Sequence, residues 1–155
     1  MSRATTMGCA ARLAFALLVV AACDPAPKFA TSMRLSGVEI PAEVLNAGER
    51  VYTLRCASCH GDDGSGTGAA AGALKVKPRD FRAAEFVYTS TPTGELPTEG
   101  DLDLTIRMGR VESGMPAWPG LSDADRHAVI QYIKTFSPRW QAEAPRASAA
   151  PEQGS

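Results

Sequence analysis

Hydrophobic positions recur at helical spacing in two long stretches of the chain, which predicts two helices of several turns each. The first stretch is residues 41–55, PAEVLNAGERVYTLR, where the leading proline suits a first helical turn. The residues that share one stripe of this stretch are Val44, Ala47, Gly48, Val51 and Tyr52. A glycine inside a helix costs about 1 kcal/mol against alanine, so Gly48 favours the close approach of another helix.

The second stretch begins at Ser122 and ends before Pro138. Ser122 and Asp125 form a capping box, the pattern of a helix N-terminus. The hydrophobic positions that follow at helical spacing are Val129, Ile130, Ile133 and Phe136. A shorter helix is expected over Asp101–Gly109, DLDLTIRMG, because the segment ends at a glycine.

The segments between these helices are long and lack a sustained period. They are a glycine-rich stretch to about residue 72, an irregular stretch over 83–100, and the loop RVESGMPAWPG over 110–120. Loops of this length usually have a functional reason, and the hydrophobic core is small for a folded part of about 95 residues, 42–137. A group other than side chains is therefore expected to fill the middle.

The N-terminal region has the pattern of an export signal. Arg3 and Arg12 precede the apolar run LAFALLVVAA, which is far shorter than the roughly 20 residues that span a bilayer. The following VAAC resembles a bacterial lipoprotein box, which makes residues 1–22 a lipoprotein signal peptide and Cys23 a lipidated N-terminus. Cleavage by an ordinary signal peptidase is the alternative.

Both ends of the mature chain are expected to be irregular. Residues 23–41 predict a lipidated N-terminus followed by a flexible tether, and residues 138–155 predict a disordered tail rich in Ala and Pro. The formal charge is −1 for the whole chain. Without the two signal arginines it becomes 14 − 17 = −3, and nothing in it points to nucleic acid.

The segment CASCHG, residues 56–61, carries the candidate chemistry. Cys-x-x-Cys-His is the attachment pattern of a c-type haem, because thiols three residues apart at a helix end reach the two vinyl groups. Cys56 and Cys59 are then the covalent anchors, and His60 is an axial ligand of the haem iron. A thioredoxin-like dithiol would need a preceding strand, and a structural zinc would need four ligands where only His127 remains as a further partner.

Met115 is the candidate for the second axial ligand of the iron. It lies in the loop SGMPAWPG between a glycine that allows a turn and a proline that stiffens it. Met33 falls in the expected tether, and Met108 falls in a helical pattern where packing is the simpler role. His127 lies off the apolar stripe of the last helix, which is typical of a surface residue.

With these features in order, the chain resembles the single-haem class I cytochromes c with histidine and methionine ligands, over about residues 43–137. The resemblance implies an all-α small cytochrome c fold, with three to five short helices and long loops around one covalently bound haem. It also implies that the first and last helices cross, with the packing residues Gly48, Tyr52, Val129 and Tyr132 at the crossing.

The resemblance implies two further residues of the haem pocket. The carbonyl of Pro78, in KVKPRDF, matches the family's acceptor for the Nδ1 proton of the proximal imidazole. Trp118 is expected to pack at the haem edge or donate to a propionate, with plain core filling as the alternative.

The expected function is electron transfer on one covalent haem c in a bacterial respiratory chain, without catalysis. The protein is expected to be exported and membrane-anchored on the periplasmic or outer face of the inner membrane. Expected partners are redox proteins: a quinol-oxidising complex, a terminal oxidase or a dehydrogenase. The alternatives are a haem-based ligand-binding or sensor protein and the electron-entry subunit of a periplasmic dehydrogenase.

Overall fold

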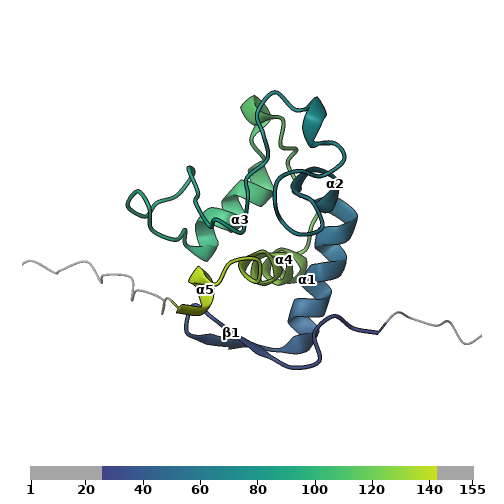
Figure 1. The fold of residues 1–155 in the computed structure, drawn as a ribbon, viewed down its shortest axis with the longest axis vertical. Helices are drawn as coiled ribbons and strands as arrows, with labels where there is room; N and C mark the ends of the chain where they lie inside the picture. The colour runs from purple at the N-terminus through teal and green to yellow at the C-terminus, as the bar shows by residue number, and fades with distance from the viewer. Residues whose placement is uncertain (1–25, 143–155) are drawn as a thin grey trace, which may run out of the picture.

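A computed structural model describes residues 26–142 as a mostly helical domain (Figure 1). Its elements in chain order are β1 (Met33–Leu35), β2 (Val38–Ile40), α1 (Ala42–Arg55), α2 (Ala57–His60), η1 (Ala71–Ala73), α3 (Glu99–Met108), η2 (Val111–Ser113), α4 (Asp123–Lys134) and α5 (Arg139–Ala142). The expected class of a small helical domain with long loops is confirmed, and one short two-stranded sheet is added to it. Within the described residues, no helix has the length and apolar character needed to cross a membrane.

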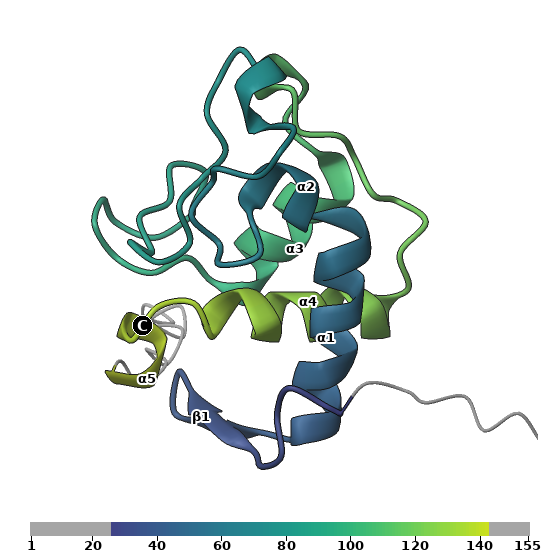
Figure 2. The same ribbon diagram turned by 45° about the vertical axis from the view of Figure 1, so that its right-hand side comes forward.

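Helices α1 and α4 cross at the centre of the domain (Figures 1 and 2). The crossing is close because Gly48 has no side chain: a Cβ there would lie 2.1 Å from the Ala128 carbonyl oxygen. On the same side, the rings of Tyr52 and Tyr132 lie 5.2 Å apart. Tyr52, Tyr132 and Val129 are all buried, so the packing role expected for these residues is confirmed.

The segment expected to be a flexible tether is folded from Phe29 onwards. Strands β1 and β2 pair antiparallel, and each buries its last residue, Leu35 at 0% and Ile40 at 5% exposure. The amide of Asn46 on α1 exchanges two hydrogen bonds of 2.9 Å with the backbone of Phe29. The tether prediction was therefore wrong for this segment, because buried side chains and backbone hydrogen bonds hold it against the helices. Cys23 lies outside the described residues.

The first part of the expected disordered tail is also folded. Helix α5 follows Pro138 and buries Trp140 at 2% exposure. The Ser36 N–H in the hairpin turn donates to the Trp140 carbonyl over 2.5 Å, which joins the two ends of the domain. The tail prediction was wrong for residues 139–142, and residues 143–155 lie outside the described part of the chain.

Capping residues determine where α3 and α4 begin. The Thr98 and Asp101 side chains form a reciprocal capping box, so α3 begins two residues earlier than its pattern predicted. At the start of α4, the Ser122 hydroxyl accepts from the Asp125 N–H over 3.1 Å. The two helices are joined where Lys134, 1% exposed, bonds to Glu99.

Candidate functional site

The two cysteines and the histidine of CASCHG lie within about one helical turn. Cys56 separates α1 from α2: its N–H donates to the Tyr52 carbonyl over 2.8 Å, and its carbonyl accepts from the His60 N–H over 2.9 Å. Gly61 ends α2 with a φ of 78°, a left-handed conformation that glycine adopts without strain. The local sequence alone thus presents two thiols and an imidazole from one short segment.

Both thiols are free. Burial, together with the charge of Cys59, raises the pKa of the Cys56 thiol to about 11, so Cys56 is protonated at neutral pH. Within residues 26–142, no group of three or more His, Cys, Asp and Glu side chains is placed to hold a metal ion. The described part of the chain therefore gives the zinc interpretation no ligand set.

The imidazole of His60 is held on two sides. Its Nδ1 lies 3.2 Å from the carbonyl oxygen of Arg79, and since a carbonyl only accepts, Nδ1 carries the proton. Its ring stacks on Phe81, with centroids 4.4 Å apart and planes 13° from parallel. Burial lowers the pKa of His60, which favours the neutral form with a free lone pair on Nε2. This is the form of histidine that binds iron.

The partner of Nδ1 corrects the role expected for Pro78. The carbonyl of Pro78 lies instead against Gly66, where an added Cβ would come within 2.3 Å of its oxygen. The next carbonyl along the chain, that of Arg79, is the one at the imidazole. The segment KPRDF was therefore the right one, and the prediction missed the acceptor by one residue because sequence does not show which way a carbonyl points.

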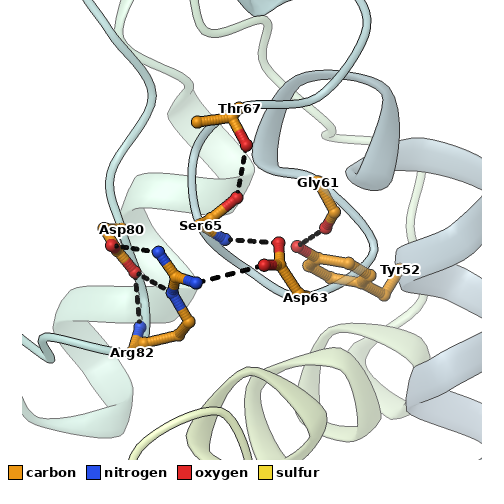
Figure 3. Close-up of polar contacts among 7 residues, drawn as sticks. All are labelled: Tyr52, Gly61, Asp63, Ser65, Thr67, Asp80 and Arg82. Atoms are coloured by element: carbon orange, nitrogen blue, oxygen red, sulfur yellow. Dashed lines mark hydrogen bonds and ion pairs between the residues drawn. The ribbon is translucent and has the colours of Figure 1, made fainter.

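The loop after CASCHG is tied to the segment that carries Arg79 (Figure 3). The guanidinium of Arg82 binds Asp80 in a fork, with two bonds of 2.9 Å, and reaches Asp63 over 3.1 Å. These contacts lower the pKa of Asp80 to about 2, chiefly through the Arg82 hydrogen bond. The pKa of Asp63 is also lowered, first by hydrogen bonds from Ser65 and then by Arg82.

A backbone bond joins the same two segments: the Phe81 N–H donates to the Gly64 carbonyl over 2.8 Å. Phe81 and Arg82 were not identified from the sequence. Two features of the sequence could have pointed to them: an aromatic residue two positions after Arg79, and the Asp-x-Arg spacing of Asp80 and Arg82.

Met115 lies in a tight loop that begins at the end of α3. The backbones of Arg110 and Met115 form an isolated bridge, with hydrogen bonds of 2.9 and 3.0 Å in opposite directions. Gly114 has a φ of 85°, which the turn requires, and Met115 is half-buried against the core. Because Gly114 approaches the Leu74 side chain after η1, the loop lies at the same end of the domain as α2 (Figures 1 and 2).

The other residues considered as ligands lie on β1, α3 and α4. Met33 is part of β1, and Met108, which was expected to pack, is 60% exposed at the end of α3. The His127 side chain is 53% exposed, with Nδ1 3.8 Å from a Glu99 carboxylate oxygen. This position agrees with the surface role expected for His127.

Trp118 is partly buried against the core. Its backbone N–H donates to the Ile106 carbonyl over 3.0 Å, and the Arg55 guanidinium lies 5.6 Å from the centre of its ring. Trp118 therefore links the Met115 loop to the C-terminal end of α1.

The donor set fits a covalently bound haem. Two unpaired thiols lie three residues apart, a neutral imidazole follows with Nδ1 already bonded, and a half-buried thioether lies in a braced loop. Thiols form thioethers with vinyl groups, and an imidazole and a thioether are a common pair of iron ligands in cytochromes c.

Comparison with known proteins agrees with this chemistry. Residues 43–133 match the family model described as "Cytochrome C oxidase, cbb3-type, subunit III". Among solved structures, a chain of the Kuenenia stuttgartiensis reducing HAO-like protein complex Kustc0457/Kustc0458 is similar, with 36% sequence identity and a TM-score of 0.65. The match covers 73% of the present chain and 51% of that chain, so the present chain corresponds to about half of its relative.

The matched family consists of cytochrome c domains, which imply haem-based electron transfer on a covalent haem c. Cys56 and Cys59 are consistent with that attachment. Domains of this kind are typically periplasmic, and they are typically electron carriers and not enzymes. The family model covers more than half of the chain, and the chain belongs to the cytochrome c oxidase, cbb3-type, subunit III family.

Proposed function

We propose that this protein carries single electrons on one haem c in a bacterial respiratory chain, held at the membrane by a lipid on Cys23. The observation that carries the proposal is the arrangement of CASCHG, in which two free thiols flank a turn and the Nδ1 of His60 is bonded to Arg79. A bound haem would supply an iron that changes between ferrous and ferric states. The residues of CASCHG and the Met115 loop would hold that centre.

Each site residue has a separate role in the proposal. Cys56 and Cys59 would attach the group covalently, and His60 would supply Nε2 as one ligand of its iron. Met115 would supply its thioether as the other, which favours a higher reduction potential than a second histidine does. Trp118 packs at the pocket edge, where the Arg55 guanidinium lies over its ring.

The proposed anchor would hold the domain close to the membrane. From Cys23 to Ala26, the first described residue, an extended chain spans at most about 11 Å. From Phe29 onwards the chain is docked onto α1 and α4. A lipidated Cys23 would therefore restrict the domain more than a long flexible tether would.

The proposed partners are membrane-bound or periplasmic redox proteins, such as a quinol-oxidising complex, a terminal oxidase or a dehydrogenase. The similar chain of known structure belongs to a redox protein complex, which supports a role in association with a larger partner. Copurification from native membranes would distinguish a free carrier from a complex subunit, including the electron-entry subunit of a dehydrogenase.

The absorption spectrum of the purified protein tests the ligand set. A methionine-to-iron charge-transfer band in the ferric form is expected, and Met115→Ala should abolish it. Met108→Ala is the matched control, because this side chain is 60% exposed and should leave the band unchanged. A wild-type spectrum without the band would contradict ligation by Met115.

Carbon monoxide separates electron transfer from ligand sensing. Slow or negligible binding to the native ferrous protein is expected, because the Arg110–Met115 bridge braces the loop that supplies the thioether. Rapid binding would favour the alternative of a sensor or ligand-binding protein.

Membrane fractionation tests the anchor. Cys23→Ser is expected to release the protein into the periplasmic fraction with an unchanged haem spectrum. A variant that remains bound to the membrane would contradict lipidation at Cys23.

A further inference from the structure

Two loops converge on the imidazole of His60, and among the described residues one side chain links them by ion pairs. The first loop follows Gly61 and carries Asp63, and the second carries Arg79 and Arg82. Arg82 is the linking residue, because its fork holds Asp80 of its own loop while its third nitrogen reaches Asp63 across the gap. Figure 3 shows the guanidinium between the two carboxylates.

The second loop supplies both contacts that hold the imidazole. The Arg79 carbonyl accepts the Nδ1 proton, and the Phe81 ring stacks on the imidazole face. Both residues lie within three positions of Arg82, so a shift of this loop away from Asp63 would move both contacts. A backbone hydrogen bond from the Phe81 N–H to the Gly64 carbonyl also holds the two loops together.

We infer that Arg82 is a positioning residue for His60: by bridging Asp80 and Asp63 it holds the Arg79 carbonyl at Nδ1. The inference rests on the proposed role of His60 as an axial ligand. A hydrogen bond at Nδ1 makes the imidazole a more basic ligand, which stabilises ferric iron over ferrous iron. Arg82 would thereby keep the reduction potential lower than it would be with a loosely held imidazole.

Surface ion pairs contribute little to stability on average. The effect inferred for Arg82 must therefore come from the geometry of its contacts. The Arg82 side chain is 50% exposed, but it is bidentate to Asp80, and a planar fork with a third contact is specific to arginine. Lysine keeps the charge and cannot make the fork. Arg82→Lys therefore tests the effect of the forked contact while the positive charge is retained.

The test compares Arg82→Lys with wild-type holoprotein in two measurements. The reduction potential is expected to rise, and the rise should persist at high salt, where the effect of an exposed charge is screened. In the ferrous protein labelled with ¹⁵N-histidine, the Nδ1 proton of His60 is expected to exchange roughly tenfold faster, because a charge-assisted contact that holds its acceptor is lost. The chain has two histidines, and the exposed His127 serves as the internal reference.

Two further variants make the result specific. Asp63→Asn removes the ion pair between Arg82 and the first loop and leaves the fork to Asp80. A smaller rise in reduction potential and a smaller increase in exchange are therefore expected. Arg107→Lys is the matched control, because its side chain is 49% exposed and pairs with Asp103 on α3. It should change neither measurement. If Arg82→Lys fails to mature, Asp63→Asn carries the test alone.

Unchanged potential and unchanged exchange in Arg82→Lys and Asp63→Asn would overturn the inference. The wild-type spectrum reports separately on the proposed function. A protein without histidine and methionine ligation would contradict that function before any variant is compared. A correctly ligated protein that is insensitive to Arg82 would contradict the positioning role alone.

Discussion

Among single residues, Tyr52 combines a role that the sequence predicted with one that it did not. Its ring packs against Tyr132 at the helix crossing, as the resemblance implied. Its hydroxyl also donates to the Gly61 carbonyl over 2.7 Å, at the point where α2 ends. Burial raises the pKa of Tyr52, so the hydroxyl remains a donor across the physiological range. The residue therefore connects the helix crossing to the CASCHG segment.

Removing only the hydroxyl of Tyr52 isolates this second role. Tyr52→Phe is expected to lower the free energy of unfolding by about 1 kcal/mol, because the Gly61 carbonyl keeps its other donor, the Gly64 N–H. Denaturant unfolding of the holoprotein measures the difference. Tyr88→Phe is the control, since Tyr88 is 46% exposed, and its expected change is within about 0.5 kcal/mol. Equal effects of the two substitutions would contradict the role of the hydroxyl.

Asp80 gives the stability a dependence on acid pH. Its folded-state pKa of about 2 lies below the ordinary value, so its ionised form stabilises the fold above pH about 4. That contribution should disappear as the pH falls through 2. The melting temperature of wild type should therefore exceed that of Asp80→Asn at pH 7, and the gap should close between pH about 4 and 2.

A gap that stays constant over this range would show that Asp80 acts through something other than its charge. Asp62→Asn is the matched control, because Asp62 is exposed in the neighbouring loop and makes none of the Arg82 contacts. Its melting curve should follow wild type at each pH.

Among the elements, α1 and α4 form the frame on which the site is built. The two helices pack through Gly48, and α1 leads directly into the turn that carries both thiols. Tyr52 contacts the rings of Tyr132, Phe136 and Phe81. Of these, Phe81 comes from the loop that also stacks on His60. The helix crossing and the imidazole are thus connected through the rings of Tyr52 and Phe81.

The close contact at the helix crossing predicts that adding one methyl group at Gly48 destabilises the fold. In Gly48→Ala the new Cβ would meet backbone atoms of Ala128, which cannot rotate away, so the helices must separate. A loss of about 1–3 kcal/mol is expected, despite the higher helix propensity of alanine. Thermal unfolding measures it.

Gly72→Ala provides the comparison, because nothing lies within 4 Å of a Cβ at that glycine. This control should be neutral or slightly stabilising. Similar melting temperatures for Gly48→Ala and wild type would mean that the two helices can move apart without loss.

In the whole molecule, the two ends of the described part of the chain close the side of the domain opposite CASCHG (Figures 1 and 2). The hairpin and α5 meet at the Ser36–Trp140 hydrogen bond, and Phe29 packs edge-on against Tyr132 at a centroid distance of 6.0 Å. Lys28 adds a hydrogen bond of 2.6 Å to the Tyr132 hydroxyl. These segments extend the core beyond the residues 43–133 that match the family model.

The contacts between the hairpin and α5 predict that α5 contributes to the stability of the fold. Trp140→Ala is expected to cost about 3–5 kcal/mol, the usual range for removing a buried aromatic side chain. Gln141→Ala is the neighbouring control, because Gln141 is exposed. If denaturant unfolding found no difference between the two variants, the segment after Pro138 would be the disordered tail that the sequence predicted.

The sequence by itself determined the features that depend on neighbours along the chain. The spacing of Cys56, Cys59 and His60 follows from one helical turn, and the helix patterns follow from periodicity and caps. The family matched to residues 43–133 agrees with both. Ligation by Met115 and lipidation of Cys23 stay predictions, which the experiments above address.

The tertiary structure decided the contacts between segments that lie far apart in the sequence. His60 and Arg79 are 19 positions apart, and only the folded loops show that Arg79, not Pro78, presents its carbonyl to the imidazole. The hairpin could not be predicted from the sequence, because each three-residue strand buries only its last residue and so shows no hydrophobic period. A two-stranded hairpin is marginally stable alone, and this one packs against α5, which it also meets at the Ser36–Trp140 hydrogen bond.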